Sequence, residues 1–169
     1  MPVAHKSIIV TGAGSGIGEG TARHLATQGA LVTVNDINAE AGERVASEIR
    51  AAGGQAHFVR ADVTLSADVQ ALVSAAVQQH GRLDCVVNNA GWTHRNRPLL
   101  EVSEADFDRV YAINVKSIYL TAIHAVPVMR SQGGGSFINI ASTAGIRPRP
   151  GLTWYNGSKA AVIGTSKSM

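Results

Sequence analysis

Short runs of β-branched residues alternate along this chain with longer segments of helical period, and this alternation restricts the possible folds more than any other feature. Strands are predicted at 6–12, 30–36, 55–63, 82–91 and 136–142, and helices at about 16–28, 38–54, 66–81 and 103–135. Strands joined through helices run parallel within one sheet, and the helices pack on its two faces. Near-continuous Val, Ile and Leu is typical of strands covered on both faces. We therefore predict a three-layer α/β fold around a doubly wound parallel sheet.

The whole chain, 1–169, is predicted to form a single domain, because no linker, repeat or low-complexity tract divides it. Its net charge of +3 is too small to indicate nucleic-acid binding. The sequence has no stretch of about 20 consecutive apolar residues, so no membrane span is expected. A single cysteine, Cys85, excludes an internal disulfide framework and favours a cytoplasmic location. No metal site is predicted.

A glycine-rich stretch, TGAGSGIG at Thr11–Gly18, follows the first predicted strand and opens the first predicted helix. Its glycines do not follow the G-x-G-x-x-G spacing. A turn without side chains still lets backbone N–H groups and a helix N-terminus approach a pyrophosphate. The stretch therefore predicts a dinucleotide-binding loop, and the alternative is a merely tight turn.

Asp36 ends the second predicted strand and favours NAD over NADP. A carboxylate at this position can accept hydrogen bonds from the adenosine ribose hydroxyls of NAD. The same charge repels the extra phosphate of NADP, and neither Arg nor Lys is present to receive it at Ala13, Gly14, Ser15 or Ile37. The alternative is a surface aspartate that caps the next helix.

A further helix is predicted near the end of the chain, and Tyr155 and Lys159, four residues apart at its start, share one of its faces. An ammonium group close to a phenol favours the phenolate, which lets the tyrosine donate or take a hydroxyl proton while hydride moves at carbon. Alone, the pair is a weak signal, because surface helices often carry it by chance.

Further polar residues fall at the same predicted edge of the sheet. Asn88–Gly91, NNAG, and Ser142 end the fourth and fifth predicted strands, at the carboxyl edge where open α/β sheets bind ligands. Asn114 is a polar residue within an otherwise apolar helix. Taken singly, Ser142 is equally explained as a helix or turn cap, and Asn114 as a satisfied core amide.

Together these residues resemble the short-chain dehydrogenase/reductase family, and the match runs through the whole chain in order. Thr11–Gly18 looks like its T-G-x-x-x-G-x-G loop, Asp62–Val63 like its adenine-contacting pair, and Asn88–Gly91 like its N-N-A-G segment. The family's catalytic tetrad is matched by Asn114, Ser142, Tyr155 and Lys159.

The resemblance implies a Rossmann-like fold and a role for each site residue. Tyrosine is the acid/base, serine orients the substrate oxygen, lysine also binds the nicotinamide ribose, and asparagine holds a water in a proton relay. The implied cofactor contacts are Gly12, Ser15, Gly16, Ile17, Gly18, Asp36, Ile37, Asp62, Val63, Asn89, Ala90, Gly91, Tyr155 and Lys159.

The resemblance also implies features beyond the cofactor site. Family members continue past the equivalent of Met169 with further strands and a substrate lid, so the C-terminal substrate-binding part is expected to be absent from this chain. Members commonly form dimers or tetramers through the long helix around Asn114 to Arg130 and the helix that carries Tyr155, so a homo-oligomer is expected.

Four arginines in two loops at the catalytic edge bear on the substrate: Arg95, Arg97, Arg147 and Arg149. We interpret them as attracting an anionic or carrier-bound substrate, against the alternative of solvated loops or a subunit contact. Trp92 and Trp154 are candidates for an apolar wall, although a lone tryptophan usually serves packing.

The leading interpretation is an oxidoreductase that exchanges hydride between NAD(H) and a secondary alcohol or ketone. The first alternative is a 3-oxoacyl carrier-protein reductase that uses NADPH, against which Asp36 counts. The second is a nucleotide-binding or assembly protein without turnover.

Overall fold

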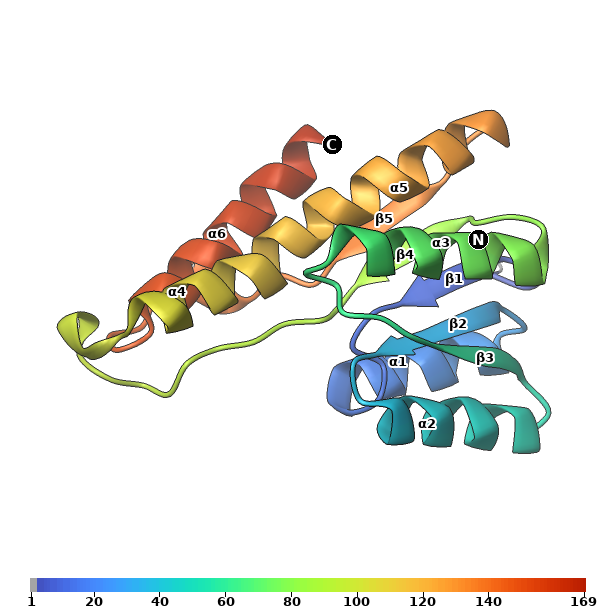
Figure 1. Cartoon of the computed structure of the whole chain (residues 1–169), viewed down its shortest axis with the longest axis horizontal. Coiled ribbons are helices and arrows are strands. Elements are labelled where there is room, and N and C mark those ends of the chain that lie inside the picture. The colour runs from blue at the N-terminus through green and yellow to red at the C-terminus, as the bar shows by residue number, and fades with distance from the viewer. Residues whose placement is uncertain (1–2) are drawn as a thin grey trace.

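We describe residues 3–169 in a computed structural model. Strands and helices alternate through most of the chain (Figure 1). The strands are β1 (Ser7–Val10), β2 (Leu31–Asp36), β3 (Gln55–Arg60), β4 (Cys85–Asn88) and β5 (Ser136–Asn139). The α-helices are α1 (Gly16–Thr27), α2 (Ala39–Ala51), α3 (Ser66–His80), α4 (Glu104–Tyr111), α5 (Ser117–Ser131) and α6 (Thr153–Ser168).

The five strands form one parallel sheet in the order β3-β2-β1-β4-β5, which confirms the predicted fold class. Four strands end earlier than predicted: β1 at Val10, β3 at Arg60, β4 at Asn88 and β5 at Asn139. The residues that follow leave the ladder at its carboxyl edge and form loops there. Ser142 consequently lies beyond β5 rather than at its end.

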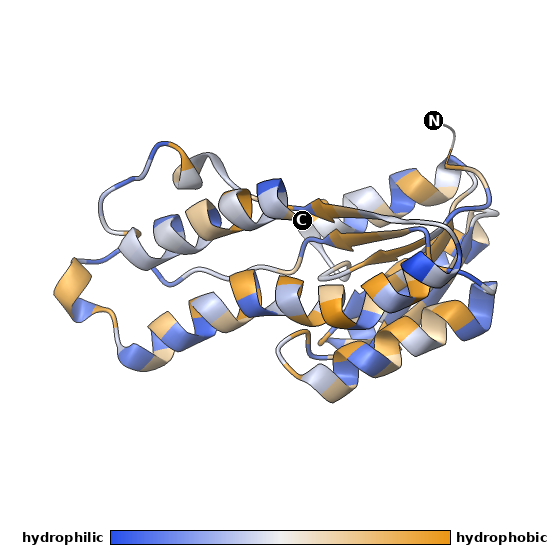
Figure 2. Ribbon diagram, turned by 90° about the horizontal axis from the view of Figure 1, so that it is seen from above, coloured by the Kyte–Doolittle hydropathy of each residue, from blue (hydrophilic) through white to orange (hydrophobic). Residues whose placement is uncertain are grey.

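Two apolar cores fill the space between the sheet and its helices. On one face, α1 and α2 pack over Ile8 and Val10 of β1. On the other face, α3 and α5 pack over Ile9, because successive side chains of a strand point to opposite faces. Apolar colouring runs through the strands, whereas the helices mix apolar and polar residues (Figure 2).

Coverage of both faces holds for the three central strands and fails at the sheet edges. All of β1 and most of β2 and β4 are buried. The edge strands β3 and β5 are only partly buried, and the Ile138 side chain is 52% exposed. The two outer strands lack a strand neighbour on one side, and their side chains are less covered than those of the central strands.

The predicted long helix is one helical run of three parts, in which a π-helical turn, Ala112–Lys116, joins α4 to α5. By length and composition alone, Glu104–Ser131 is long and apolar enough to cross a membrane. In this fold α5 instead packs against α3 and β4, with Ala125 and Met129 in the core. The π turn matters for the site because it carries Asn114.

Candidate active site

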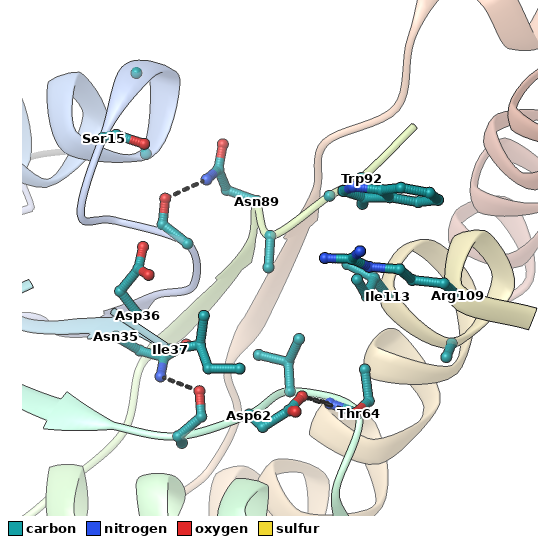
Figure 3. Close-up of a pocket in the computed structure, with 18 of the residues that line it drawn as sticks. Ser15, Asn35, Asp36, Ile37, Asp62, Thr64, Asn89, Trp92, Arg109 and Ile113 are labelled. Carbon is teal, nitrogen blue, oxygen red and sulfur yellow. Dashed lines mark hydrogen bonds between the residues drawn. The ribbon is translucent and has the colours of Figure 1, made fainter. Parts of the chain in front are cut away.

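A cleft of about 780 Å³ opens at the carboxyl edge of the sheet (Figure 3). It lies where β1 and β4 are neighbours and the chain connections diverge to either side, which is the usual ligand position in open α/β sheets. The loops after β1, β2, β3 and β4 line it, together with α4 and the π turn. Every residue predicted to contact the cofactor lines this cleft, except Tyr155 and Lys159.

The glycine-rich loop after β1 fits closely against the loop after β4. Gly12 and Gly16 have positive φ angles of 62° and 56°, which favour glycine. A Cβ on Gly18 would collide with the Gly12 carbonyl oxygen and with Asn89 Nδ2. Asn89 Nδ2 donates to the Thr11 and Gly12 carbonyl oxygens at 2.8 and 3.0 Å. The loop therefore holds a fixed shape with its backbone open to the cleft.

Asp36 is held by backbone groups at the end of β2. Its Oδ2 accepts a hydrogen bond from Gly14 N at 2.9 Å, and its Oδ1 accepts one from Asn38 N at 2.9 Å. Asn38, rather than Asp36, caps α2, through its side-chain contact with Ala41 N. The helix-cap alternative for Asp36 is therefore wrong. Each carboxylate oxygen keeps a lone pair for a ligand hydroxyl.

Apolar side chains form the walls of the cleft beside this carboxylate. Ile37 is 57% exposed, and Val63 and Ile113 also line the cleft. The Asp62 carboxylate bonds within its own loop, where its Oδ1 accepts hydrogen bonds from Thr64 N and Thr64 Oγ1. Exposed aliphatic walls of this kind suit a flat aromatic base.

Asn114 is 2% exposed and connects three segments. Its Oδ1 accepts from Trp92 N at 2.8 Å, and its Nδ2 donates to Trp92 O at 2.9 Å and to Ser158 Oγ at 3.0 Å. It thereby ties the π turn to the loop after β4 and to α6. Both amide hydrogens are used within the protein, and one Oδ1 lone pair is left.

Lys159 is buried on α6, with 5% of its surface exposed. Its Nζ donates to Ile140 O at 2.7 Å and lies 5.9 Å from the centre of the Tyr155 ring. Burial lowers the pKa of this lysine. A Cβ built on Gly91 would lie 3.4 Å from Asn114 Oδ1 and 3.7 Å from Lys159 Nζ. The structure therefore brings Asn114 and Lys159 together directly behind the cleft wall, with Tyr155 adjacent.

Ser142 caps the short 3-10 turn Thr143–Gly145, because its Oγ accepts from Ala144 N at 3.1 Å. The turn-cap alternative therefore describes one of its contacts. This bond uses an acceptor position of the hydroxyl and leaves its O–H proton available. The Ile140 carbonyl that Lys159 holds is two residues earlier in the same loop.

Arg109 lines the cleft although it gave no signal in the sequence, and it lies next to Trp92, which the sequence offered as a candidate apolar wall. Trp92 and Arg109 lie at the opposite end of the cleft from Asp36, with the guanidinium carbon 4.4 Å from the centre of the indole ring (Figure 3). Arg109 looks like any other arginine of an amphipathic helix, so only the packing of α4 places it here. Trp154 contacts Phe107 at 5.2 Å between ring centres, which is a packing role.

The two arginine-bearing loops lie side by side. Asn96 Nδ2 donates to Pro150 O, and Arg97 N donates to Gly151 O, each at 3.1 Å. Arg97 Nη1 also lies 3.8 Å from Asp106 Oδ2. The loops after β4 and β5 therefore form one continuous surface next to Tyr155.

Comparison with known proteins identifies the family. The model of the short chain dehydrogenase family matches residues 6–169. This chain belongs to that family, which confirms the resemblance deduced from its motifs.

Three relatives show how far the likeness extends. A 4-formylbenzenesulfonate dehydrogenase of Comamonas testosteroni is 53% identical over 95% of this chain and 64% of its own length. The structure of a 3-ketoacyl-(acyl-carrier-protein) reductase from Brucella melitensis, complexed with NADH, matches with a TM-score of 0.93 and 39% identity. The match covers 98% of this chain and 68% of the Brucella chain. The structure of a short chain dehydrogenase/reductase from Burkholderia phymatum in complex with NAD matches with a TM-score of 0.95 and 32% identity. This match covers 99% of this chain and 60% of the Burkholderia chain. This chain thus spans about two thirds of the length of the relatives that it matches.

Proposed function

We propose that this chain is the cofactor-binding and catalytic part of an oxidoreductase that exchanges hydride between NAD(H) and a secondary alcohol or ketone. One observation carries the proposal. The glycine-rich loop and the Asp36 carboxylate line one cleft, and Lys159, beside Tyr155, lies directly behind the wall of that cleft at Gly91. Solved relatives with NAD and with NADH support the choice of cofactor.

The described residues fit a nicotinamide dinucleotide. The volume of about 780 Å³ lies within the usual range of small-molecule sites. The N-terminus of α1 at Gly16 faces the cleft and suits a pyrophosphate. Asp36 has lone pairs for ribose hydroxyls, and Ile37 and Val63 offer an apolar wall to the adenine. When bound, the cofactor supplies the hydride chemistry.

The protein's own groups handle the proton. Tyr155 gives its hydroxyl proton to the substrate carbonyl oxygen in reduction and takes the proton back in oxidation. Ser142 donates its free O–H proton to the same oxygen and orients it. The Lys159 ammonium stabilises negative charge on the tyrosine oxygen. The remaining Oδ1 lone pair of Asn114 accepts from a water that supplies the proton.

Cofactor binding and turnover test this function together. The full chain is titrated with NADH and with NADPH by fluorescence, and initial rates are measured over a panel of ketones and secondary alcohols. We expect NADH to bind at least about tenfold more tightly than NADPH, because Asp36 repels the added phosphate. Saturable NADH binding without any turnover would instead favour the binding or assembly protein. Failure to bind either cofactor would contradict both.

A carrier-protein reductase is the second candidate. Besides the Brucella structure, a 3-oxoacyl-(acyl-carrier-protein) reductase of Thermotoga maritima is 37% identical over 99% of this chain. Asp36 counts against NADPH as the cofactor for this chain. Equal rates with NADPH and NADH on a carrier-bound ketone would make this candidate the better one.

We also propose that the substrate is anionic. Arg95, Arg147 and Arg149 are exposed on the joined loops next to Tyr155, where they attract a negative group. The substrate in the name of the Comamonas relative is a sulfonate. The variant Arg147→Ala/Arg149→Ala should raise KM for a sulfonated aldehyde or ketone about fivefold or more and leave KM for a neutral analogue unchanged. Equal effects on both substrates would contradict the proposal.

The remaining proposals concern the whole protein. We propose a single domain over 1–169 and a homo-oligomer, a dimer or tetramer, that assembles through α5 and α6. Tyr119 and Ile123 of α5 are 60% and 42% exposed, which suits a subunit contact, and light scattering measures the oligomeric state.

We further propose a cytoplasmic location, where Cys85 stays a thiol. Burial raises the pKa of Cys85 to about 11.

A further inference from the structure

Arg44 lies on α2 and reaches back to the glycine-rich loop. Its Nη2 donates to Gly14 O at 3.0 Å. The N–H of the same glycine donates to Asp36 Oδ2 at 2.9 Å. One peptide segment is therefore held from two sides, by a guanidinium at its carbonyl and by the carboxylate at its amide.

Arg44 and the Asp36 carboxylate both bond to Gly14. A Cβ built on Gly14 would lie 2.8 Å from Asp36 Oδ2 and 3.0 Å from Ala41 Cβ, so these three residues converge. Ala41 and Arg44 are three residues apart on α2 and so are neighbours on one helix face, with Cβ atoms about 5–6 Å apart. The guanidinium thus belongs to the surroundings of the carboxylate, although it is distant from it in sequence.

Two glutamates hold the guanidinium in its present position. Glu19 of α1 accepts from Arg44 Nη2 at 2.8 Å and from Nη1 at 3.1 Å, and Glu48 of α2 lies 3.3 Å from Nη1. Hydrogen bonds from Arg44 and Arg23 hold the pKa of Glu19 at about 2, so this carboxylate stays charged near neutral pH. The Arg44 side chain is 45% exposed, and exposed ion pairs hold a side chain only weakly. A stronger anion nearby can therefore redirect the guanidinium.

We propose that Arg44 is a specificity-determining residue at the adenosine end of the cleft. With Asp36 in place it only positions Gly14, because the carboxylate keeps a phosphate away. When Asp36 is replaced by a neutral residue, Arg44 supplies the positive charge that holds an adenosine 2′-phosphate. This inference rests on the proposed cofactor site.

A set of variants tests the inference by binding alone. Dissociation constants for NADH and NADPH are measured by fluorescence titration in the parent chain, Asp36→Ser, Arg44→Ala and Asp36→Ser/Arg44→Ala. We expect Asp36→Ser to bind NADPH at least about tenfold more tightly than the parent, and the double variant to lose most of this gain. The gain should shrink as the salt concentration rises.

Arg50→Ala in the same background is the matched control. Arg50 also lies on α2, donates to a backbone carbonyl, that of Ala56, and pairs with Glu43, but it does not contact the glycine-rich loop. Asp36→Ser/Arg50→Ala should keep the NADPH gain. Asp36→Asn is a second variant that keeps an acceptor oxygen for the loop, and circular dichroism verifies that each variant is folded.

Two results overturn the inference. The first is a double variant with Arg44→Ala that binds NADPH as tightly as Asp36→Ser alone. The second is the absence of any NADPH gain in both folded Asp36 variants while the parent binds NADH. If the parent binds neither cofactor, the proposed function itself fails, and this outcome is distinct from the other two.

Discussion

At the scale of single residues, some polar side chains of the site have their donors paired within the protein, and others keep a donor available for a ligand. Asn114 Nδ2 donates both of its hydrogens, one to Trp92 O and one to Ser158 Oγ. Ser142 accepts from Ala144 N and keeps its own proton. A buried lysine beside Tyr155 completes the set. Asn114 therefore stabilises the contact between the π turn and α6, and Ser142 and Tyr155 keep hydroxyl groups that suit the proposed proton transfer.

Tyr155→Phe tests the proton-transfer role of that residue. We expect turnover to fall at least about 100-fold, because the phenol that gives and takes the proton is lost. The dissociation constant for NADH should change less than about twofold, because the aromatic ring beside Lys159 remains. Initial rates and fluorescence titrations measure the two quantities. Tyr119→Phe, on the exposed face of α5, should change neither, and full activity in Tyr155→Phe would refute the mechanism.

At the scale of elements, the start of α1 depends on contacts with another loop. Gly18 lies on the side of α1 that faces Gly12 O and Asn89 Nδ2, whereas Gly20, two residues later on the same helix, has no heavy atom within 4 Å of a built Cβ. Both glycines cost the helix conformational entropy. Only at Gly18 does the missing side chain let the helix backbone lie close to Gly12 O and Asn89 Nδ2.

The two glycines therefore give opposite predictions for substitution by alanine. Gly18→Ala should lower the free energy of unfolding by about 1–3 kcal/mol and weaken NADH binding at least about tenfold, because the loop must shift. Gly20→Ala should raise the free energy of unfolding by about 0.5–1 kcal/mol and leave NADH binding unchanged. Urea denaturation and NADH titration measure both effects. A stable Gly18→Ala variant with normal binding would show that the close approach has no role.

At the scale of the whole molecule, two partly buried histidines contribute to the contact between the sheet and α3. His57 of β3 lies edge-on to His80 at the end of α3, with 5.0 Å between ring centres. His57 Nδ1 and His80 Nε2 are buried atoms, and neither has a hydrogen-bond partner within residues 3–169. Burial, with the neighbouring His80 and Arg50, lowers the pKa of His57 to about 4, and burial also lowers the pKa of His80. The fold therefore favours both rings in their neutral form.

This preference makes the fold sensitive to acid. The folded pKa of His57 lies below its unfolded value of about 6.5, so the unfolded chain binds the proton more readily, and stability falls as pH drops from about 6.5 to about 4. Between pH 8 and pH 5, His57 alone should cost about 2 kcal/mol in the free energy of unfolding. Urea denaturation across this range measures the loss. His57→Gln should flatten the dependence, and an unchanged slope in that variant would assign it to other groups.

The parallel α/β fold and most of the lining of the cleft could be predicted from the sequence. The reason is local: the periods of strands and helices, and the glycines of a tight turn, are set by neighbouring residues. Gly12 to Gly18, Asp36 and Asn88–Gly91 lie at or just after the carboxyl ends of strands, and the ends of parallel strands meet at one edge, so the motif order already predicted that they lie together.

Features that depend on packing between distant segments could be seen only in the folded structure. The π turn under Asn114, the edge exposure of β5 and the stack of Trp92 with Arg109 leave no local pattern. The positions that the sequence indicates as neighbours of Asp36, namely Ala13, Gly14, Ser15 and Ile37, carry no basic residue. The structure brings Arg44 to Gly14 from the second turn of a helix that packs against the same loop. Side-chain neighbours of this kind are fixed by how helices pack on the sheet, and no short stretch of sequence records that arrangement.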